Sequence, residues 1–236
     1  MTAFLKREFS GWSIFEVLWT IFVCLTITAL AVFWNDTVLG IISAVTGVLY
    51  VIFTGKGKIL AFGFGIINCV LYSAISYGAQ LYGETILNVF YYLPMMFVGI
   101  CAWNKNMDEE TRQVKKRHMT NGGRILLCIG LGTITFAGGK LLESMGDAMP
   151  YIDSFTTVAS VIAMVVSVKR YAEQWWIWLA VNGVSIYMWW QNFVQGNDNM
   201  ATLIMWVVYL INGVFILIKW EKDLKNERRE KDGYRN

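Results

Sequence analysis

The segment Glu173–Asn192, EQWWIWLAVNGVSIYMWWQN, combines indole rings with one central amide and holds five of the eleven tryptophans of the chain. At the 3.6-residue period of a helix, one face carries Trp175, Trp178, Asn182, Ser185 and Trp189. The other rings and amides, those of Trp176, Tyr187, Trp190 and Gln191, point elsewhere. Indole faces stack on flat rings and attract delocalised cations. An amide hydrogen-bonds hydroxyls or a carboxamide. The face therefore predicts a site for a small neutral or singly cationic ligand that has a ring and hydroxyl groups.

Other uncharged polar side chains lie midway along apolar runs. Asn68, Tyr92, Tyr209 and Asn212 fall at the same depth as Asn182 when the runs are placed as helices. An amide at that depth is costly unless it is paired or faces water. Two interpretations stay open for each asparagine, a hydrogen bond that joins two helices and the lining of a cavity.

Pro94 lies midway along another apolar run, close to Asn88, Tyr91 and Tyr92. It removes one backbone hydrogen bond, frees the carbonyl of Phe90 and predicts a bend in that helix. The full candidate set of substrate-binding residues is Asn68, Tyr72, Asn88, Tyr91, Trp175, Trp178, Asn182, Trp189, Gln191 and Asn212.

Catalytic and metal-binding patterns are absent from the sequence. No HExxH motif, P-loop, serine–histidine dyad or pair of aspartates at membrane depth occurs. The four cysteines are far apart and form no CxxC pair, so we expect them to pack as small apolar side chains. We expect no catalytic residue, metal or cofactor, and we expect the only histidine, His118, to be solvated in a basic loop.

The elements that position these residues are membrane helices. The chain has 236 residues, of which 56% are hydrophobic and 16% charged, and its mean hydropathy is +0.47. A soluble domain has roughly a quarter charged residues. Eight apolar runs of membrane-spanning length are Phe15–Trp34, Thr37–Thr54, Ile59–Ala79, Glu84–Trp103, Arg124–Leu142, Tyr151–Val168, Trp175–Val194 and Met200–Lys219. The sequence predicts an all-α integral membrane protein with eight transmembrane helices.

Loop charge predicts the orientation of these helices. If the N-terminus is cytoplasmic and the spans alternate, all of the 20 Lys and Arg except Lys140 lie on the inner side. This bias follows the positive-inside rule and places both termini in the cytoplasm. The tail after Trp220 alternates in charge and lacks interleaved aromatic residues, so we expect a solvated basic extension and no nucleic-acid partner.

Internal similarity predicts two repeats. Asn68 aligns with Asn182 at a shift of 114 residues, and Trp103 aligns with Trp220 at a shift of 117. The nearly equal shifts predict two parallel three-helix repeats joined by a linker helix, plus an extra N-terminal helix. The expected organisation is an N-terminal helix over 1–36, a first repeat over 37–104, a loop and linker helix over 105–149, a second repeat over 150–220 and a tail over 221–236. Substrate is expected between the repeats.

Two segments resemble a known family. Leu81–Trp103 contains Asn88-Val89-Phe90-Tyr91, and Glu173–Trp178 contains Trp175-Trp176-Ile177-Trp178. They are similar to the NxxY and WxxW motifs of the PnuC family of bacterial vitamin transporters. The stretch Thr54–Gly65 and the helix layout also resemble that family, from about Asp36 to Trp220.

The resemblance implies uptake of nicotinamide riboside across the bacterial inner membrane by facilitated diffusion, with trapping by phosphorylation inside the cell. It also implies a SWEET-like fold and a homotrimer in the lipid bilayer. The absence of an ionisable side chain in the central part of any span favours a facilitator independently. The alternatives are a facilitator for thiamine or sugar, and a membrane scaffold that does not transport. The direction in which the side chains point from the helix favours Trp175 over Trp176 as the first tryptophan of the WxxW motif.

Overall fold

A computed structural model describes residues 8–33, 37–78, 82–109, 111, 113–146, 149–194 and 200–233. These residues form helices, with two isolated β-bridges and no sheet among them. The first helices along the chain are α2 (Ile14–Phe33), α3 (Val38–Gly55), α4 (Leu60–Gly78), α5 (Tyr82–Leu87), the π-helix η1 (Asn88–Tyr92) and α6 (Leu93–Asn104). They are followed by α7 (Asn121–Ser144), α8 (Pro150–Val168), α9 (Gln174–Val194) and α10 (Met200–Gly233).

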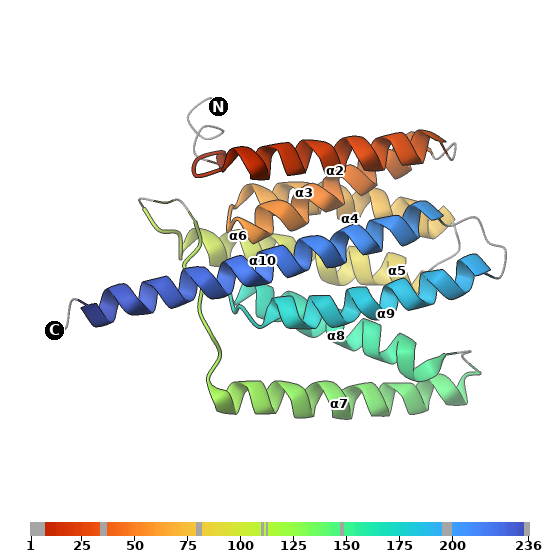
Figure 1. Ribbon diagram of the computed structural model, residues 1–236. Helices are drawn as coiled ribbons and strands as arrows, with labels where there is room; N and C mark the ends of the chain where they lie inside the picture. The colour runs from red at the N-terminus through yellow and green to blue at the C-terminus, as the bar shows by residue number, and fades with distance from the viewer. Residues whose placement is uncertain are drawn as a thin grey trace. The chain divides into compact units, whose positions relative to one another are not determined.

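Among the described residues, each predicted span coincides with helical structure, and the predicted all-helical fold is confirmed for this part of the chain (Figure 1). Within the described residues, six helical stretches are long and apolar enough to cross a membrane, and they are Ile14–Phe33, Val38–Gly55, Thr85–Asn104, Asn121–Ser144, Pro150–Val168 and Leu203–Arg229. The third and seventh predicted spans form α4 and α9. The apolar part of α4 covers Leu60–Ile75, and α9 carries amide and indole groups. A count of eight spans therefore stays a prediction.

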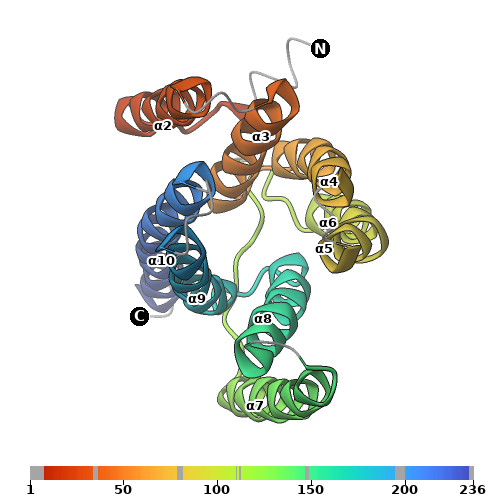
Figure 2. The same cartoon turned by 90° about the vertical axis from the view of Figure 1, so that its right-hand side faces the viewer.

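The chain divides into two compact units, residues 1–115 and 116–236. In the first unit, α3 lies beside α4, and α2 lies along α3 (Figures 1 and 2). Close contact between α4 and α6 depends on glycine. A Cβ on Gly99 would lie 2.2 Å from the Phe62 ring, and one on Gly65 would lie 2.6 Å from the sulfur of Met96.

In the second unit, α7 packs on α8, α8 on α9, and α9 on α10 (Figure 2). The contact between α7 and α8 is close because a Cβ on Gly139 would lie 2.3 Å from the Tyr151 ring. A buried apolar cluster of Ala159, Ala163, Val166, Ile177 and Val181 joins α8 to α9. The helix predicted to link the repeats thus packs within the second unit.

The end of α10 differs from the solvated extension expected after Trp220. The helix continues without a break to Gly233, well past the apolar stretch (Figure 1). Buried Leu224 and the ion pair between Lys116 and Asp223 attach the first turns of this extension to the second unit.

The turns that end α3 and α8 have the same backbone geometry. After α3, Gly57 has a φ of +68°, its amide donates to the Thr54 carbonyl at 2.9 Å, and the Lys58 amide donates to the Phe53 carbonyl at 3.0 Å. After α8, Arg170 has a φ of 64°, and the amides of Arg170 and Tyr171 donate to the carbonyls of Ser167 and Val166 at 2.8 and 3.1 Å. Both turns end a helix with a left-handed residue, a position that favours glycine.

Aromatic packing beyond each turn is also similar. In the first unit, Phe62 on α4 meets Trp103 on α6 edge to face, with ring centroids 5.0 Å apart. In the second unit, Trp175 on α9 meets Trp220 on α10 edge to face at 5.7 Å. All four rings are buried, and each pair joins the start of one helix, α4 or α9, to another helix of the same unit.

Candidate substrate-binding residues

Helix α9 presents two distinct faces. Trp176, Ala180, Gly183, Tyr187 and Trp190 form an exposed stripe at spacings of three and four residues, and Trp176 and Trp190 are 61% and 51% exposed. Trp175, Asn182 and Ser185 are buried on the other face. The predicted division of the tryptophans between an outward and an inward face is confirmed for these positions. The Trp189 side chain lies outside what the structure describes.

Asn182 is buried midway along α9, with 6% of its surface exposed. The backbone of α10 approaches it closely, because a Cβ on Gly213 would lie 2.9 Å from Leu179 and 3.9 Å from the Asn182 amide nitrogen. Glycine at this position therefore leaves room beside the amide. Asn212, the neighbouring residue on α10, is buried as well.

Trp175 is 3% exposed, and its ring is held against Trp220. The Lys116 ammonium lies 5.2 Å from the centroid of the Trp220 ring, and Lys116 also pairs with Asp223. Burial lowers the pKa of Lys116, and the negative charge of Asp223 opposes that shift. The indole N–H of Trp175 is buried and finds no acceptor among the described residues.

Trp178 is half-buried and packs against the apolar cluster between α8 and α9. Trp206 on α10 packs against the same cluster, and its buried indole N–H also lacks an acceptor in the described part of the chain. A buried donor without a partner costs about 1–3 kcal/mol unless a ligand or water accepts from it. The sequence analysis missed Trp206, although its spacing from Tyr209 places both rings on one side of α10, with centroids 5.7 Å apart.

The amide of Asn68 is used between helices. On α4, its Nδ2 donates to the Ser43 carbonyl at 2.8 Å and to Ser43 Oγ at 3.2 Å, both on α3. This geometry fits the first of the two interpretations of the asparagines, a hydrogen bond that joins two helices. Counted from the matching turns, Asn68 corresponds to Val181, one residue before Asn182. The two asparagines therefore differ both in register and in surroundings.

The bend predicted at Pro94 takes the form of a π-helical turn. Over Asn88–Tyr92 the helix widens, and the Leu93 amide donates to the Asn88 carbonyl five residues earlier. A π-turn absorbs a backbone disruption inside a continuous helix and often marks a functional site. Asn88 is buried, whereas Tyr91 and Tyr92 are half-buried with ring centroids 5.4 Å apart.

The remaining candidates are placed as follows. Tyr72 on α4 and Gln191 on α9 are both half-buried. The two units are described separately, so the structure brings together only candidates within one unit. In the second unit, Trp178, Asn182 and Asn212 lie on the helices that meet at Gly213. In the first unit, Asn88 and Tyr91 lie within η1.

His118 is not solvated, and the expectation from its basic loop is wrong. Only 13% of its side chain is exposed, and its two ring nitrogens lie 3.3 Å from a Glu173 oxygen and 3.5 Å from a Glu221 oxygen. Glu173, just before α9, also accepts from the Met119 amide at 3.1 Å and from Arg124 at 2.7 Å. Burial alone would raise the pKa of Glu173, but these hydrogen bonds and the Arg124 charge outweigh it and lower that pKa. The loop was misread because its acidic partners are distant in sequence.

Metal ligation finds no support in the described residues, where no group of three or more His, Cys, Asp or Glu side chains is placed to hold an ion. All four cysteines, each within the described part of the chain, are free thiols. The polar groups that remain on α9 and η1 are amides, phenols and indoles, which bind uncharged or cationic organic molecules.

Comparison with known proteins identifies the family. A family model described as nicotinamide mononucleotide transporter matches residues 37–222. The nicotinamide riboside transporter PnuC of Neisseria mucosa is 38% identical over 231 residues, covering 94% of this chain and 87% of that protein. The protein of the same name from Haemophilus influenzae is 32% identical over 235 residues, covering 95% and 98%. The chain belongs to the PnuC family of membrane transporters.

A solved structure agrees with this assignment. The crystal structure of the vitamin B3 transporter PnuC superposes with a TM-score of 0.84 and 37% sequence identity, covering 96% of this chain and 99% of that one. The protein is thus a multi-pass membrane transporter with the PnuC fold, and it is not an enzyme. Its NxxY residues lie on η1 and its WxxW residues at the start of α9.

Proposed function

We propose that this protein carries nicotinamide riboside across the bacterial cytoplasmic membrane by facilitated diffusion, with phosphorylation inside the cell trapping the product. The observation that carries the proposal is the inward face of α9, where half-buried Trp178 lies one turn before buried Asn182 in a PnuC protein. A pyridinium ring is attracted to the face of an indole ring, and ribose hydroxyls form hydrogen bonds with amides.

Within this proposal, Trp178 stacks near the pyridinium, and Asn182, Asn88 and Tyr91 bond the ribose or the carboxamide. Trp206 joins them as a donor, because its indole N–H has no acceptor in the described chain. Tyr72, Trp189, Gln191 and Asn212 remain candidates of lower rank. Trp175 and Asn68 are supported less, since the ring of one is held by Trp220 and the amide of the other by Ser43.

The riboside is favoured over the mononucleotide of the family description. A phosphate monoester carries about −1.5 to −2 charges at neutral pH and is bound in proteins by Arg, Lys or helix N-termini. The only Lys and Arg in the predicted spans are Arg124, Lys140 and Lys219, and all three lie at or near the end of a span. A phosphate at membrane depth would therefore lack a cationic partner.

The same sequence fact favours diffusion over coupled transport. Proton- and ion-driven transporters keep an ionisable group at depth for the coupling ion. Here the acidic residues of the spans lie near their ends, at Glu16, Glu84 and Asp153. We infer that substrate equilibrates and is not concentrated by the protein itself.

Repeat ancestry is part of the proposal. The matching left-handed turns at Gly57 and Arg170 support two copies of one three-helix unit. The matching edge-to-face pairs, Phe62 with Trp103 and Trp175 with Trp220, support it independently. Cytoplasmic termini rest on loop charge. A homotrimer and a SWEET-like arrangement rest on the resemblance to the PnuC family, and light scattering of the purified protein tests the trimer.

The deciding experiment compares ligands on the purified protein. Calorimetric titration with nicotinamide riboside, nicotinamide mononucleotide, thiamine and ribose should give binding for the riboside alone. In proteoliposomes without a kinase, internal and external riboside should equalise. Tighter binding of thiamine or ribose would favour the alternative facilitator, and concentration of free riboside by a proton or sodium gradient would refute diffusion.

A further inference from the structure

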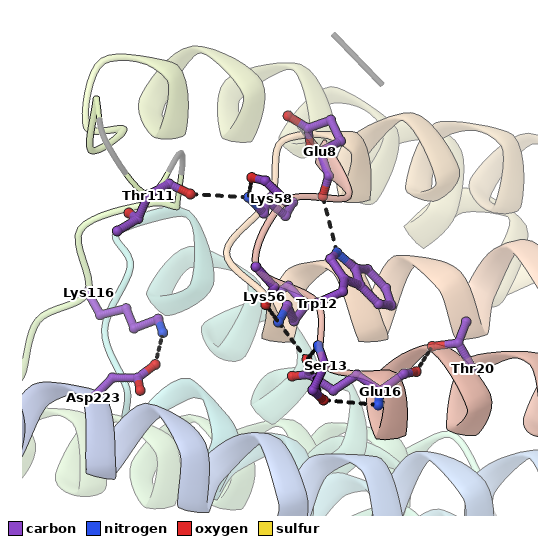
Figure 3. A network of polar contacts seen from close by, with 12 residues as sticks. Glu8, Trp12, Ser13, Glu16, Thr20, Lys56, Lys58, Thr111, Lys116 and Asp223 are labelled. Atoms are coloured by element: carbon purple, nitrogen blue, oxygen red, sulfur yellow. Dashed lines mark hydrogen bonds and ion pairs between the residues drawn. The ribbon is translucent and has the colours of Figure 1, made fainter. Parts of the chain in front are cut away.

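The chain segment before and at the start of α2 wraps around the turn that joins α3 to α4. This segment, residues 8–16, comprises a turn at Glu8–Gly11 and the first residues of α2. Figure 3 shows Glu8, Trp12, Ser13 and Glu16 gathered beside Lys56 and Lys58 of the turn. We call residues 8–16 the N-terminal clasp.

The two lysines of the turn are buried, Lys56 at 4% and Lys58 at 0% exposure. The clasp supplies partners to both of them. Lys56 Nζ donates to the Gly11 carbonyl at 2.7 Å and to Glu16 Oε2 at 2.8 Å, and Lys58 Nζ donates to Ser10 Oγ at 3.2 Å. An ammonium removed from water needs such partners. The clasp therefore contributes partners to both buried charges, and the Thr111 carbonyl also accepts from Lys58 Nζ at 3.3 Å.

Glu16 has two roles at once. It closes a capping box at the start of α2, where the Ser13 amide donates to Glu16 Oε2 at 2.8 Å and the Glu16 amide donates to Ser13 Oγ at 3.2 Å. The same oxygen accepts from Lys56. The first turn of α2 is thus bonded directly to the turn between α3 and α4.

The clasp also fixes the start of α4. Glu8, itself 1% exposed, accepts from the Leu60 amide at 3.1 Å through Oε2. A carboxylate at a helix N-terminus satisfies a free amide and complements the helix dipole. Apolar contact adds to this, since the rings of Phe9 and Trp12 lie 5.5 and 5.0 Å from that of Phe53 at the end of α3.

The clasp residues lie outside the part of the chain that the family model covers, which begins at residue 37, whereas their partners lie inside it. They act on the turn whose two helices are joined further along by the bond from Asn68 to Ser43. The clasp contacts α3 and α4 at the turn between them, and the hydrogen bond from Asn68 to Ser43 joins them further along, so the two helices are held together at two places. A transporter that moves groups of helices as rigid bodies needs the helices within each group to keep their relative positions.

We propose that the N-terminal clasp positions the α3–α4 hairpin for the transport cycle, with Glu16 and Lys56 as positioning residues. This inference rests on the proposed function, because it assumes that the protein transports. It assigns a role to the first helix, α2, whose buried side chains are those of Val23, Ile27 and Ala31.

The test uses full-length protein and the neutral variants Glu16→Gln, Lys56→Gln and the double variant. The control is Glu143→Gln, which removes the carboxylate of an exposed ion pair with Lys140 on α7. Two quantities are measured for each protein, riboside affinity by calorimetry and the rate of riboside entry into proteoliposomes. Wild-type transport is established first, so that failure of the proposed function is seen separately.

We expect Glu16→Gln to slow entry about ten-fold or more, as displaced positioning elements do, with affinity held within about two-fold. The double variant should recover part of the rate, because it removes the Lys56 ammonium together with the carboxylate that pairs with it. Glu143→Gln should transport like the wild type. An unchanged entry rate in Glu16→Gln, even with a lower unfolding temperature, would reduce the clasp to a structural support and overturn the proposal. A loss of affinity equal to the loss of rate would overturn it too.

Discussion

Trp175 and Trp220 meet edge to face, with ring centroids 5.7 Å apart and ring planes at 74°. Phe62 and Trp103 make the same contact in the first unit, at 5.0 Å and 85°. The first tryptophan of the WxxW motif has a packing partner of its own, which separates its role from that of Trp178.

The first prediction concerns this pair. Trp175→Phe should keep folding and transport, since the ring contact is retained and a buried N–H without an acceptor is removed. Trp175→Ala should destabilise the protein by about 3–5 kcal/mol, the usual cost of deleting a buried tryptophan ring. Thermal unfolding and riboside titration of both variants check this. A ten-fold weaker affinity of Trp175→Phe at unchanged stability would instead make Trp175 a substrate contact.

The second prediction concerns the binding face of α9. Trp178→Ala should lose a ring–cation contact of about 0.5–2 kcal/mol, and Asn182→Leu a hydrogen bond of about 1–3 kcal/mol. Either loss corresponds to roughly ten-fold weaker riboside binding at about 1.4 kcal/mol per decade. Calorimetric titration measures it directly.

The matched control for that prediction is Trp190→Leu, on the exposed stripe of the same helix. Its affinity should stay close to that of the wild type. Equal losses in Trp190→Leu and Trp178→Ala would show that the binding face had been assigned to the wrong side of α9.

The third prediction contrasts the two left-handed turn residues. Gly57→Ala should destabilise the protein by about 1 kcal/mol or more, because a Cβ is strained at a positive φ. In addition, that Cβ would lie 3.2 Å from the Val114 amide nitrogen.

Arg170→Gly should be neutral or stabilising, since it relieves the same strain. Burial and the nearby Arg117 guanidinium lower the pKa of Arg170, so its charge is already disfavoured in the fold. Chemical or thermal unfolding in detergent gives the relative stabilities of the two variants and the wild type. A Gly57→Ala variant more stable than the wild type would contradict the prediction.

The fourth prediction is a pH dependence from Glu173. Its pKa is lower in the folded protein than its ordinary value of 4.5. The unfolded chain therefore takes up its proton first as the pH falls. The stabilisation is complete above about pH 4.5 and is lost as the pH drops through the folded pKa. The unfolding temperature of the wild type should fall on acidification more steeply than that of Glu173→Gln. Parallel curves would assign the acid sensitivity to other groups.

The fifth prediction is the topology. In a variant without the four native cysteines, single cysteines placed in the loop 104–123 and in the tail should be shielded from an impermeant thiol reagent in intact cells. A cysteine in Gln195–Asn199, which lies outside the described residues, should react. The reason is the confinement of all Lys and Arg but Lys140 to the inner side. External labelling of the 104–123 loop would contradict the predicted orientation of the membrane spans.

The sequence by itself determined the helices and the faces of α9. Run length and hydropathy located the long helices of the described residues, because a membrane span must satisfy its backbone internally and cover its surface with apolar side chains. Helical periodicity then separated buried Trp175 and Asn182 from exposed Trp176 and Trp190, because that separation depends only on spacing along one helix.

Only the tertiary structure decided which polar groups meet. Asn68 bonds to Ser43, His118 lies between Glu173 and Glu221, and Lys56 is held by Glu16. Each of these pairs joins residues far apart along the chain, so no local pattern could predict it. The form of the disruption before Pro94, a π-turn over Asn88–Tyr92, is likewise seen only in the structure. Buried charges and amides find their partners only when helices pack, since packing both removes water and supplies the groups that replace it.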